Sequence, residues 1–147
     1  MNNIYKGVSP IEILVFIAIV TFLVAIAIPL YDHYVMRTKM NKVFDVIVEH
    51  STAVGEYFVR EGVMPLTASD AGLDTSANQS EHLKLIIYAN ISPTQVNMSY
   101  TLDNFSEEVD DATIVYKGAA AADGVNWACE SSEVSNEYLP DRCQGRS

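Results

Sequence analysis

A single carboxylate, Glu12, stands at the head of an apolar run that extends from Ile13 to Leu30. A charge next to such a run is costly in an apolar environment unless it is paired. Glu12 follows Ser9 by three positions, which is the S-x-x-E spacing of a helix capping box. Pro10 suits the first helical position, where no amide hydrogen is needed. We therefore predict that a helix begins here and that Glu12 caps it.

Two cysteines, Cys129 and Cys143, form the second set of residues with reactive chemistry. Their separation excludes a CxxC redox motif, and no other Cys or His cluster in the sequence completes a zinc site. In an exported domain, two cysteines most simply form one disulfide. Such a bond would close a loop of about 15 residues and contribute roughly 3 kcal/mol in the chain-entropy model. Two free buried thiols are the alternative that the residues leave open.

Motifs of catalysis are missing from the sequence. It contains no G-x-S-x-G, no H-E-x-x-H, no phosphate-binding loop and no paired Cys/His nucleophile. The three histidines, His33, His50 and His82, are scattered along the chain. We therefore expect no enzyme activity, no metal and no cofactor.

Acidic residues dominate the second part of the chain. The formal net charge is -10, and thirteen acidic but only four basic side chains lie between Gly62 and Ser147. A surface of this sign repels nucleic acid, so we expect no nucleic-acid partner. The acidic residues show no calcium-loop spacing, which favours a solvated face over a cation site.

The run from Ile13 to Leu30 reads ILVFIAIVTFLVAIAIPL, with Thr21 as its only polar side chain. Eighteen such residues are enough to propose a membrane span. A cleaved secretory signal would have a shorter core followed by a small-residue cleavage site. Here the run continues directly into Tyr31 without that pattern. We predict a retained membrane segment.

The charges flanking the run give conflicting indications of orientation. Lys6 precedes the run, whereas Arg37, Lys39 and Lys42 follow it. Counting positive charges alone would place the C-terminal side in the cytoplasm. The cysteine pair indicates the opposite, because disulfides form in oxidising compartments.

A helical pattern continues beyond Pro29. Apolar residues recur at spacings of three, four and seven, at Met36, Met40, Val43, Phe44, Ile47, Val54 and Phe58, and such a stripe packs on a core. Gly62 is a suitable C-cap. We predict a helix over about residues 10–61, roughly 75–80 Å long, with Pro29 kinking or loosening it locally.

Four short segments with strand character follow a loop at 67–80. They are 82–89, 95–102, 112–117 and 125–129, separated by the turn signals Ser92-Pro93, Asp103-Asn104 and Asp123-Gly124. Short strands with short connections form an antiparallel sheet, and the helical stripe is the natural cover for its apolar face. The predicted fold class is α+β: a long N-terminal helix on a four-stranded antiparallel sheet.

The ends of the chain resemble a known family. A short basic leader ends in Gly7, a glutamate stands five residues later, and an uninterrupted apolar run leads into PLYDHYVMRTKM. Near the other end, Trp127-Ala128-Cys129 is followed by Tyr138-Leu139-Pro140 and Cys143. In these features the chain resembles a type IV pilin precursor of the class with a short leader (type IVa-like). The resemblance covers the first forty-odd residues closely and the last twenty moderately.

The resemblance implies a maturation pathway and a division of the chain. A prepilin peptidase would cut between Gly7 and Val8 and methylate the new amine of Val8. Residues 1–7 would be the leader, 8–34 the transmembrane and assembly helix, and 35–147 the globular head with the second half of the helix. The subunit would wait in the inner membrane, N-terminus in the cytoplasm, until the assembly machinery moved it into a filament of identical subunits outside the cell.

The resemblance also implies roles for single residues. Glu12 would face the N-terminal amine of a neighbouring subunit, and Cys129 with Cys143 would bound a disulfide loop near the C-terminus. The filament would serve adhesion, twitching motility or DNA uptake.

The sequence departs from the family pattern at several positions. Val8, Ser9 and Pro10 stand where members usually have Phe, Thr and Leu, and Thr21 stands where many have Gly. These departures favour a divergent or minor pilin as one alternative, and a pseudopilin of type II secretion as another. A DNA-binding competence pilin is disfavoured because it needs a basic patch with aromatic residues.

Overall fold

The computed structural model describes residues 7–144, so the predicted leader, apart from Gly7, lies outside the described residues. The chain divides into two compact units between Val35 and Met36. One helix, α1 (Pro10–Glu61), contributes to both units and continues through Pro29. Its bounds confirm the predicted helix. Gly62 follows it with φ of 75°, a left-handed conformation that glycine adopts without strain and that ends the helix.

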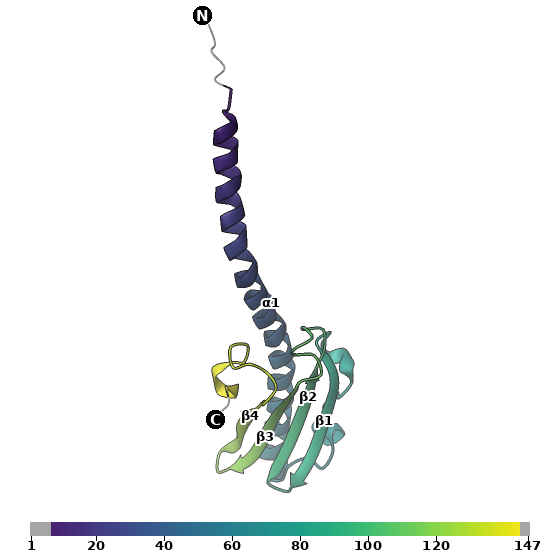
Figure 1. Ribbon diagram of the computed structural model, residues 1–147. Coiled ribbons are helices and arrows are strands. Elements are labelled where there is room, and N and C mark those ends of the chain that lie inside the picture. The colour runs from purple at the N-terminus through teal and green to yellow at the C-terminus, as the bar shows by residue number, and fades with distance from the viewer. Residues whose placement is uncertain (1–6, 145–147) are drawn as a thin grey trace, which may run out of the picture. The chain divides into compact units, whose positions relative to one another are not determined.

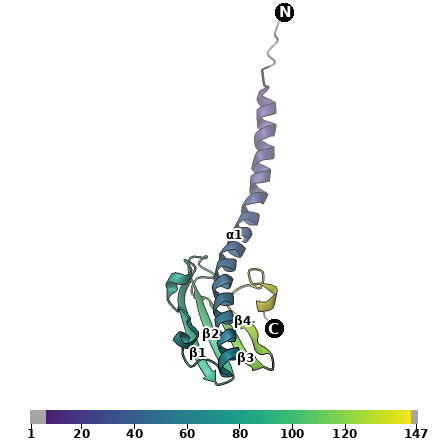
Figure 2. The same ribbon diagram turned by 180° about the vertical axis from the view of Figure 1, so that it is seen from behind.

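The second unit contains a four-stranded sheet in the order β1-β2-β3-β4. All neighbouring strands are antiparallel, which confirms the predicted α+β class. The strands are β1 (Leu83–Ser92), β2 (Gln95–Leu102), β3 (Thr113–Ala121) and β4 (Gly124–Glu130). Residues 36–61 of α1 lie across one face of this sheet, as Figures 1 and 2 show from opposite sides.

Three helical turns of the 3-10 type complete the second unit. The predicted loop 67–80 contains η1 (Ala68–Ala71) and η2 (Ala77–Gln79), and η3 (Asp141–Cys143) lies near the C-terminus.

Strands β1 and β3 are longer than predicted. β1 continues to Ser92 because the turn at Pro93-Thr94 pairs Ser92 with Gln95. β3 continues through an alanine run to Ala121, which pairs with Gly124. Alanine and asparagine have low intrinsic strand propensity, so the sequence pattern ended β3 before its alanine run and β1 before Asn90. Pairing with the neighbouring strand decides their ends.

The core of the second unit lies between α1 and the sheet. On the helix, the buried apolar side chains are Met40, Val43, Phe44, Val46, Ile47 and Val54. Alternate residues of β2 face them, namely Val96, Met98, Tyr100 and Leu102. From β3, Ile114 and Tyr116 join the same cluster. The period of two in β2 therefore matches the helical stripe of α1, as the sequence predicts.

Gly118 of β3 leaves room for the only tryptophan of the chain. A Cβ atom at Gly118 would lie 2.7 Å from Cζ3 and 2.9 Å from Cη2 of Trp127, and 3.0 Å from Cγ2 of Val96. The Trp127 ring stacks on Tyr116 with 5.2 Å between ring centroids and an interplanar angle of 16°. The stacked pair closes the β4 end of the core.

Replacing Gly118 with alanine should displace the Trp127 ring and lower the free energy of unfolding by roughly 1–3 kcal/mol, because the added methyl group overpacks this site. Thermal unfolding of the full-length protein in detergent, followed by Trp127 fluorescence, measures the change. Gly55→Ala is the matched control: its added Cβ meets nothing within 4 Å, and alanine favours the helix. Equal stability of Gly118→Ala and the parent protein would contradict the packing role.

Candidate assembly site

The carboxylate of Glu12 lies at the start of α1 and contacts Ser9, the residue immediately before the helix. The Ser9 amide donates to Oε2 of Glu12 at 3.4 Å, and the Ser9 carbonyl accepts from the Glu12 amide at 3.0 Å. This places the negative charge at the positive end of the helix dipole. The contact is one half of the predicted capping box. The side chain is exposed, so its carboxylate is accessible to a further partner.

Gly7 and Val8 precede the helix. Both residues are exposed and outside regular secondary structure, and no atom lies within 4 Å of the Cβ position of Gly7. Val8 has a relative exposure of 65%. The peptide bond between them is therefore accessible. Pro29, where the sequence predicts a kink, lies inside α1 and is distant in sequence from Gly7 and Val8.

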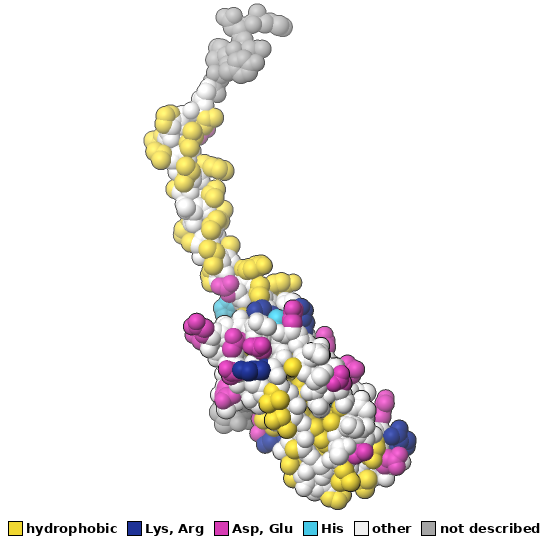
Figure 3. All heavy atoms as spheres, turned by 90° about the vertical axis from the view of Figure 1, so that its right-hand side faces the viewer, with side chains coloured by type: hydrophobic (Ala, Val, Ile, Leu, Met, Phe, Trp, Pro, Cys, Tyr) yellow, Lys and Arg dark blue, Asp and Glu magenta, His cyan; other side chains and the backbone are white. Residues whose placement is uncertain are grey.

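The first half of α1 exposes apolar side chains on every side. Thirteen large ones are exposed: Ile13, Leu14, Val15, Phe16, Ile17, Ile19, Val20, Phe22, Leu23, Val24, Ile26, Ile28 and Leu30. This segment is long and apolar enough to cross a membrane, and none of it is buried within the chain. Figure 3 shows hydrophobic side chains along it. A helix that is apolar all round requires lipid or other protein around it.

Thr21 does not interrupt the apolar surface. Its hydroxyl donates to the carbonyl of Ile17 at 2.6 Å and lies 3.1 Å from that of Ala18. A hydroxyl that bonds the preceding turn of its own helix needs no partner in an apolar environment. The one polar side chain of the run is therefore compatible with a membrane or with the interior of an assembly.

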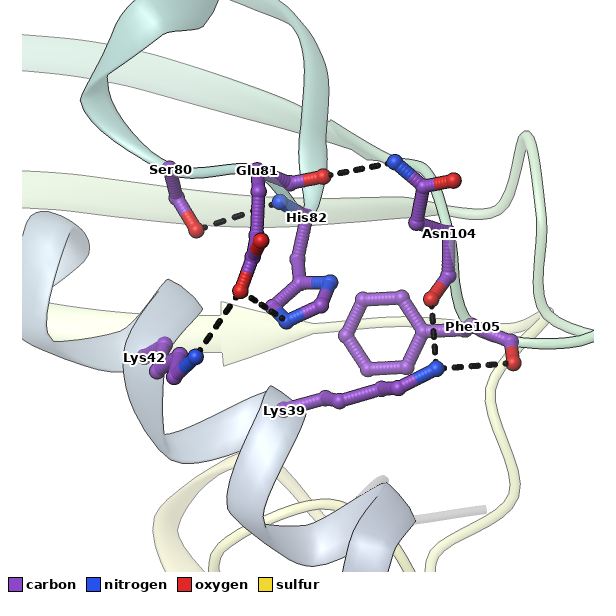
Figure 4. A network of polar contacts seen from close by, with 7 residues as sticks. All are labelled: Lys39, Lys42, Ser80, Glu81, His82, Asn104 and Phe105. Carbon is purple, nitrogen blue, oxygen red and sulfur yellow. Dashed lines mark hydrogen bonds and ion pairs between the residues drawn. The ribbon is translucent and has the colours of Figure 1, made fainter.

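A polar network that the sequence did not reveal ties α1 to two loops of the second unit (Figure 4). Lys39 Nζ donates to the carbonyl oxygens of Asn104 at 2.6 Å and Phe105 at 3.2 Å. The same ammonium group lies 5.9 Å from the centroid of the Phe105 ring. Asn104 Nδ2 donates to the carbonyl of Glu81 at 2.9 Å, so the two loops are also joined to each other.

Glu81 and His82 form the other half of this network. Lys42 Nζ donates to Oε1 of Glu81 at 2.9 Å, and this hydrogen bond lowers the pKa of Glu81. The same oxygen lies 3.4 Å from Nε2 of the buried His82, whose ring is 5.3 Å from that of Phe105. Since the Lys42–Glu81 pair is largely exposed, it contributes little energy. We infer that the network mainly orients the loops on the helix.

The second buried histidine, His50, lies in the core. Its Nδ1 is 3.0 Å from the hydroxyl oxygen of Tyr100, and 3% of the residue is exposed. Burial lowers the pKa of His50 below 6.5, an effect that Glu49 and Asp74 oppose only in part. Burial also lowers the pKa of His82, as do the nearby charges of Lys39 and Lys42, against the opposing charge of Glu81.

Stability should therefore fall on acidification. The unfolded chain takes up protons on these histidines at about pH 6.5, whereas the folded chain does so only at lower pH. The contribution of the two neutral histidines to the free energy of unfolding is fully present above about pH 6.5. It is lost as the pH falls toward the folded-state pKa values. Urea midpoints of the full-length protein, measured at several pH values through Trp127 fluorescence, test this. The double variant His50→Gln, His82→Gln should flatten the slope, and an unchanged slope would contradict the assignment.

The predicted disulfide is present between Cys129 and Cys143, which excludes the alternative of two free thiols. It links the end of β4 to η3. Val134, Leu139 and Cys143 are buried against the core. The loop also bonds β3, because the Thr113 amide donates to Oε2 of Glu133 at 2.7 Å. Among the described residues, no group of His, Cys, Asp or Glu could hold a metal ion.

These features define a protein with an apolar helix that needs lipid or other protein chains around it. The chain belongs to the pilin family: the model of pilin, a bacterial filament protein, matches residues 36–144. Its relatives include the fimbrial protein EcpC of Eikenella corrodens, 29% identical over 98% of this chain and 94% of the relative. They also include the type IV major pilin protein PilE of Neisseria gonorrhoeae, 26% identical over 92% of this chain and 80% of the relative.

Two further comparisons also find similarity to pilus proteins. The type IV major fimbrial protein FimA of Dichelobacter nodosus is 26% identical over 98% of this chain and 99% of its own length. The crystal structure of a Cs1 pilin chimera covers 76% of this chain and 98% of its own, with a TM-score of 0.52 and 18% identity, and this likeness supports the fold alone. The predicted resemblance to type IV pilins is confirmed. The family consists of structural filament subunits, so the chain is not an enzyme.

Proposed function

We propose that this pilus subunit is made as a membrane-bound precursor and then polymerised into a helical filament. A prepilin peptidase cuts between the exposed residues Gly7 and Val8 and methylates the Val8 amine. The proposal follows the domain division into a leader at 1–7, an assembly helix at 8–34 and a head at 35–147. The precursor spans the inner membrane with its N-terminus in the cytoplasm and its acidic head outside.

The observation that carries this proposal is the exposed apolar surface of residues 13–30 in a member of a filament-forming family. Burying one large apolar side chain is worth about 1.5–3 kcal/mol relative to water. For thirteen of them the gross stabilisation is roughly 20–40 kcal/mol, whether lipid or neighbouring helices bury them. The segment therefore stays out of water but can exchange one apolar environment for the other.

Glu12 determines which arrangement of neighbouring subunits the helix accepts when it leaves the lipid. In lipid the carboxylate caps its own helix, as its contact with Ser9 illustrates. In the filament the methylated Val8 amine of a neighbouring subunit pairs with it. Because a misregistered neighbour would leave the carboxylate unpaired in an apolar core, the pair sets register more than it adds stability.

Shearing surface filaments from cells and sequencing their subunits tests the proposal. We expect this protein as the main component, starting at a methylated Val8. Its presence only as a trace component would favour a minor pilin, which the unusual Val8-Ser9-Pro10 start supports. Its absence from filaments would favour a pseudopilin of type II secretion. Loss of adhesion, twitching motility or DNA uptake in a deletion strain identifies which process the filament serves.

A further inference from the structure

The ring of His82 is enclosed where three segments of the second unit meet. His82 lies just before β1, and 6% of the residue is exposed. Figure 4 shows its ring between the carboxylate of Glu81 and the ring of Phe105, which belongs to the loop between β2 and β3. Lys39 and Lys42 reach the same place from α1. We call these five residues the His82 latch, because they hold both loops on the helix.

One nitrogen of the His82 ring is buried without a hydrogen-bond partner. Among the described residues, Nδ1 of His82 has none, whereas Nε2 lies 3.4 Å from Oε1 of Glu81. A carboxylate favours the tautomer whose N–H points toward it, so we assign the hydrogen of the neutral ring to Nε2. A second proton would create a buried Nδ1–H without an acceptor, which costs free energy. The closed latch therefore favours the neutral ring.

The charged groups around the ring act in opposite directions. Burial is the largest effect and lowers the pKa of His82. The charge of Glu81, on the same segment, favours the protonated ring, whereas the ammonium groups of Lys39 and Lys42 on α1 disfavour it. The backbone of Asp103, on the loop after β2, favours the protonated ring least of all. The geometry and the charges thus agree that protonation opposes the closed latch.

Weak contacts hold the latch closed. The side chains of Lys42 and Glu81 are 54% and 67% exposed, so water competes for their ion pair. The Asp103 amide donates to the carbonyl of His82 at 3.1 Å, and the His82 amide donates to Oγ of Ser80 at 3.2 Å. His82 and Asp103 lie outside the strands. These contacts can therefore break while the hydrogen bonds between the strands remain.

We propose that protonation of His82 opens the latch and releases residues 80–82 and 103–105 from α1 while the sheet stays paired. The imidazolium ring moves into water, where both of its nitrogens find acceptors. Its departure removes the contact with the Phe105 ring, whose centroid is 5.3 Å away. All residues of the latch belong to the second unit, so the switch depends on neither cleavage nor polymerisation of the chain.

Proton linkage gives the sign and the size of the response. In the open latch the ring is in water and has its ordinary pKa of about 6.5, whereas in the closed latch the pKa is lower. The open latch therefore binds more protons, and its population rises as the pH falls. Between about pH 7.5 and about pH 5.5, one imidazole with the ordinary pKa shifts this equilibrium about tenfold.

Amide hydrogen exchange, measured by NMR on the full-length protein in detergent micelles, tests the proposal. After correction for the intrinsic pH dependence of exchange, the Asp103 amide should exchange about tenfold faster at about pH 5.5 than at about pH 7.5. It should also remain less protected than the Tyr100 amide, since Tyr100 lies in β2 between two paired strands. Low concentrations of urea should accelerate exchange at Tyr100 more than at Asp103, because local opening exposes little surface.

Two results for the wild-type protein would overturn the proposal. The first is exchange at Asp103 that does not change with pH. The second is equal protection of Asp103 and Tyr100 at about pH 5.5, which would mean that the loops open only when the whole unit unfolds.

Neutral variants at position 82 identify the group that takes up the proton. His82→Phe keeps an aromatic ring beside Phe105 but binds no proton, so exchange at Asp103 should be the same at both pH values. His82→Gln is a second neutral variant with the same expected result. His50→Gln is the matched control, because His50 is equally buried but lies in the core, and it should keep the tenfold response. A response that persists in both His82 variants would assign the opening to another group and overturn the proposal.

Discussion

Replacing Glu12 with valine leaves the protein produced and membrane-bound but lowers the yield of surface filaments by roughly a hundredfold or more. Removing one partner of a buried ion pair costs about 3–5 kcal/mol, since the other charge is left unpaired. In the filament that we propose, that other charge would be the Val8 amine of a neighbouring subunit. The effect falls on assembly alone, because the valine removes a charge that membrane insertion does not need.

The measurement compares sheared filaments with the membrane fraction by quantitative immunoblotting. Glu56→Val is the control, because Glu56 is an exposed glutamate on the same helix but in the second unit. Glu12→Asp tests the geometry of the ion pair, since it retains the charge on a shorter side chain. Loss of the helix cap alone costs about 0.5–1 kcal/mol. A reduction of only a few-fold in Glu12→Val would therefore leave capping as the sole role of this residue.

Replacing both Cys129 and Cys143 with serine lowers the free energy of unfolding of the second unit by about 3 kcal/mol. The bond closes a loop with a sequence separation of 14, and the chain-entropy model gives a loss of this size for such a loop. The last segment of the chain should detach first, because the disulfide links the edge strand β4 to η3. Trp127, two residues before Cys129, reports the change.

Urea unfolding of the full-length protein in detergent, followed by Trp127 fluorescence, gives the difference in free energy. Reductant should shift the wild-type midpoint to that of the double serine variant and leave the variant itself unchanged. A loss below about 1 kcal/mol would contradict the estimate. The buried Val134 and Leu139 would then hold the loop without the covalent bond.

The two predictions concern separate parts of the molecule. Glu12 lies at the start of a helix segment that is not buried within the chain, so we expect its effect in assembly. The disulfide acts within the second unit, so its effect appears in stability. Measuring both variants in both assays should give large changes in only one assay each.

Local patterns in the sequence determined most of the architecture. The capping spacing Ser9–Glu12, the apolar run and the stripe from Met36 to Phe58 predicted α1 to its ends, because helix formation depends on neighbours three and four residues apart. The four strands and their antiparallel order followed from short apolar alternations between turns. The disulfide was one of two chemically reasonable states of Cys129 and Cys143, and the fold decided between them.

Only the tertiary structure decided the contacts between distant residues. The lengths of β1 and β3 depend on pairing with the next strand, which the weak strand propensity of Asn90 in β1 and of the alanine run in β3 does not signal. Lys39 and Phe105 meet because the loop after β2 packs on α1, and Gly118 and Trp127 meet because β3 and β4 pair in that register. Leu85, Ile87 and Ile91 are unremarkable in sequence, since alternation alone does not tell which face of a strand is covered. Their exposure depends on where α1 and the loop 62–80 pack, and those packing energies are long-range sums that no local pattern contains.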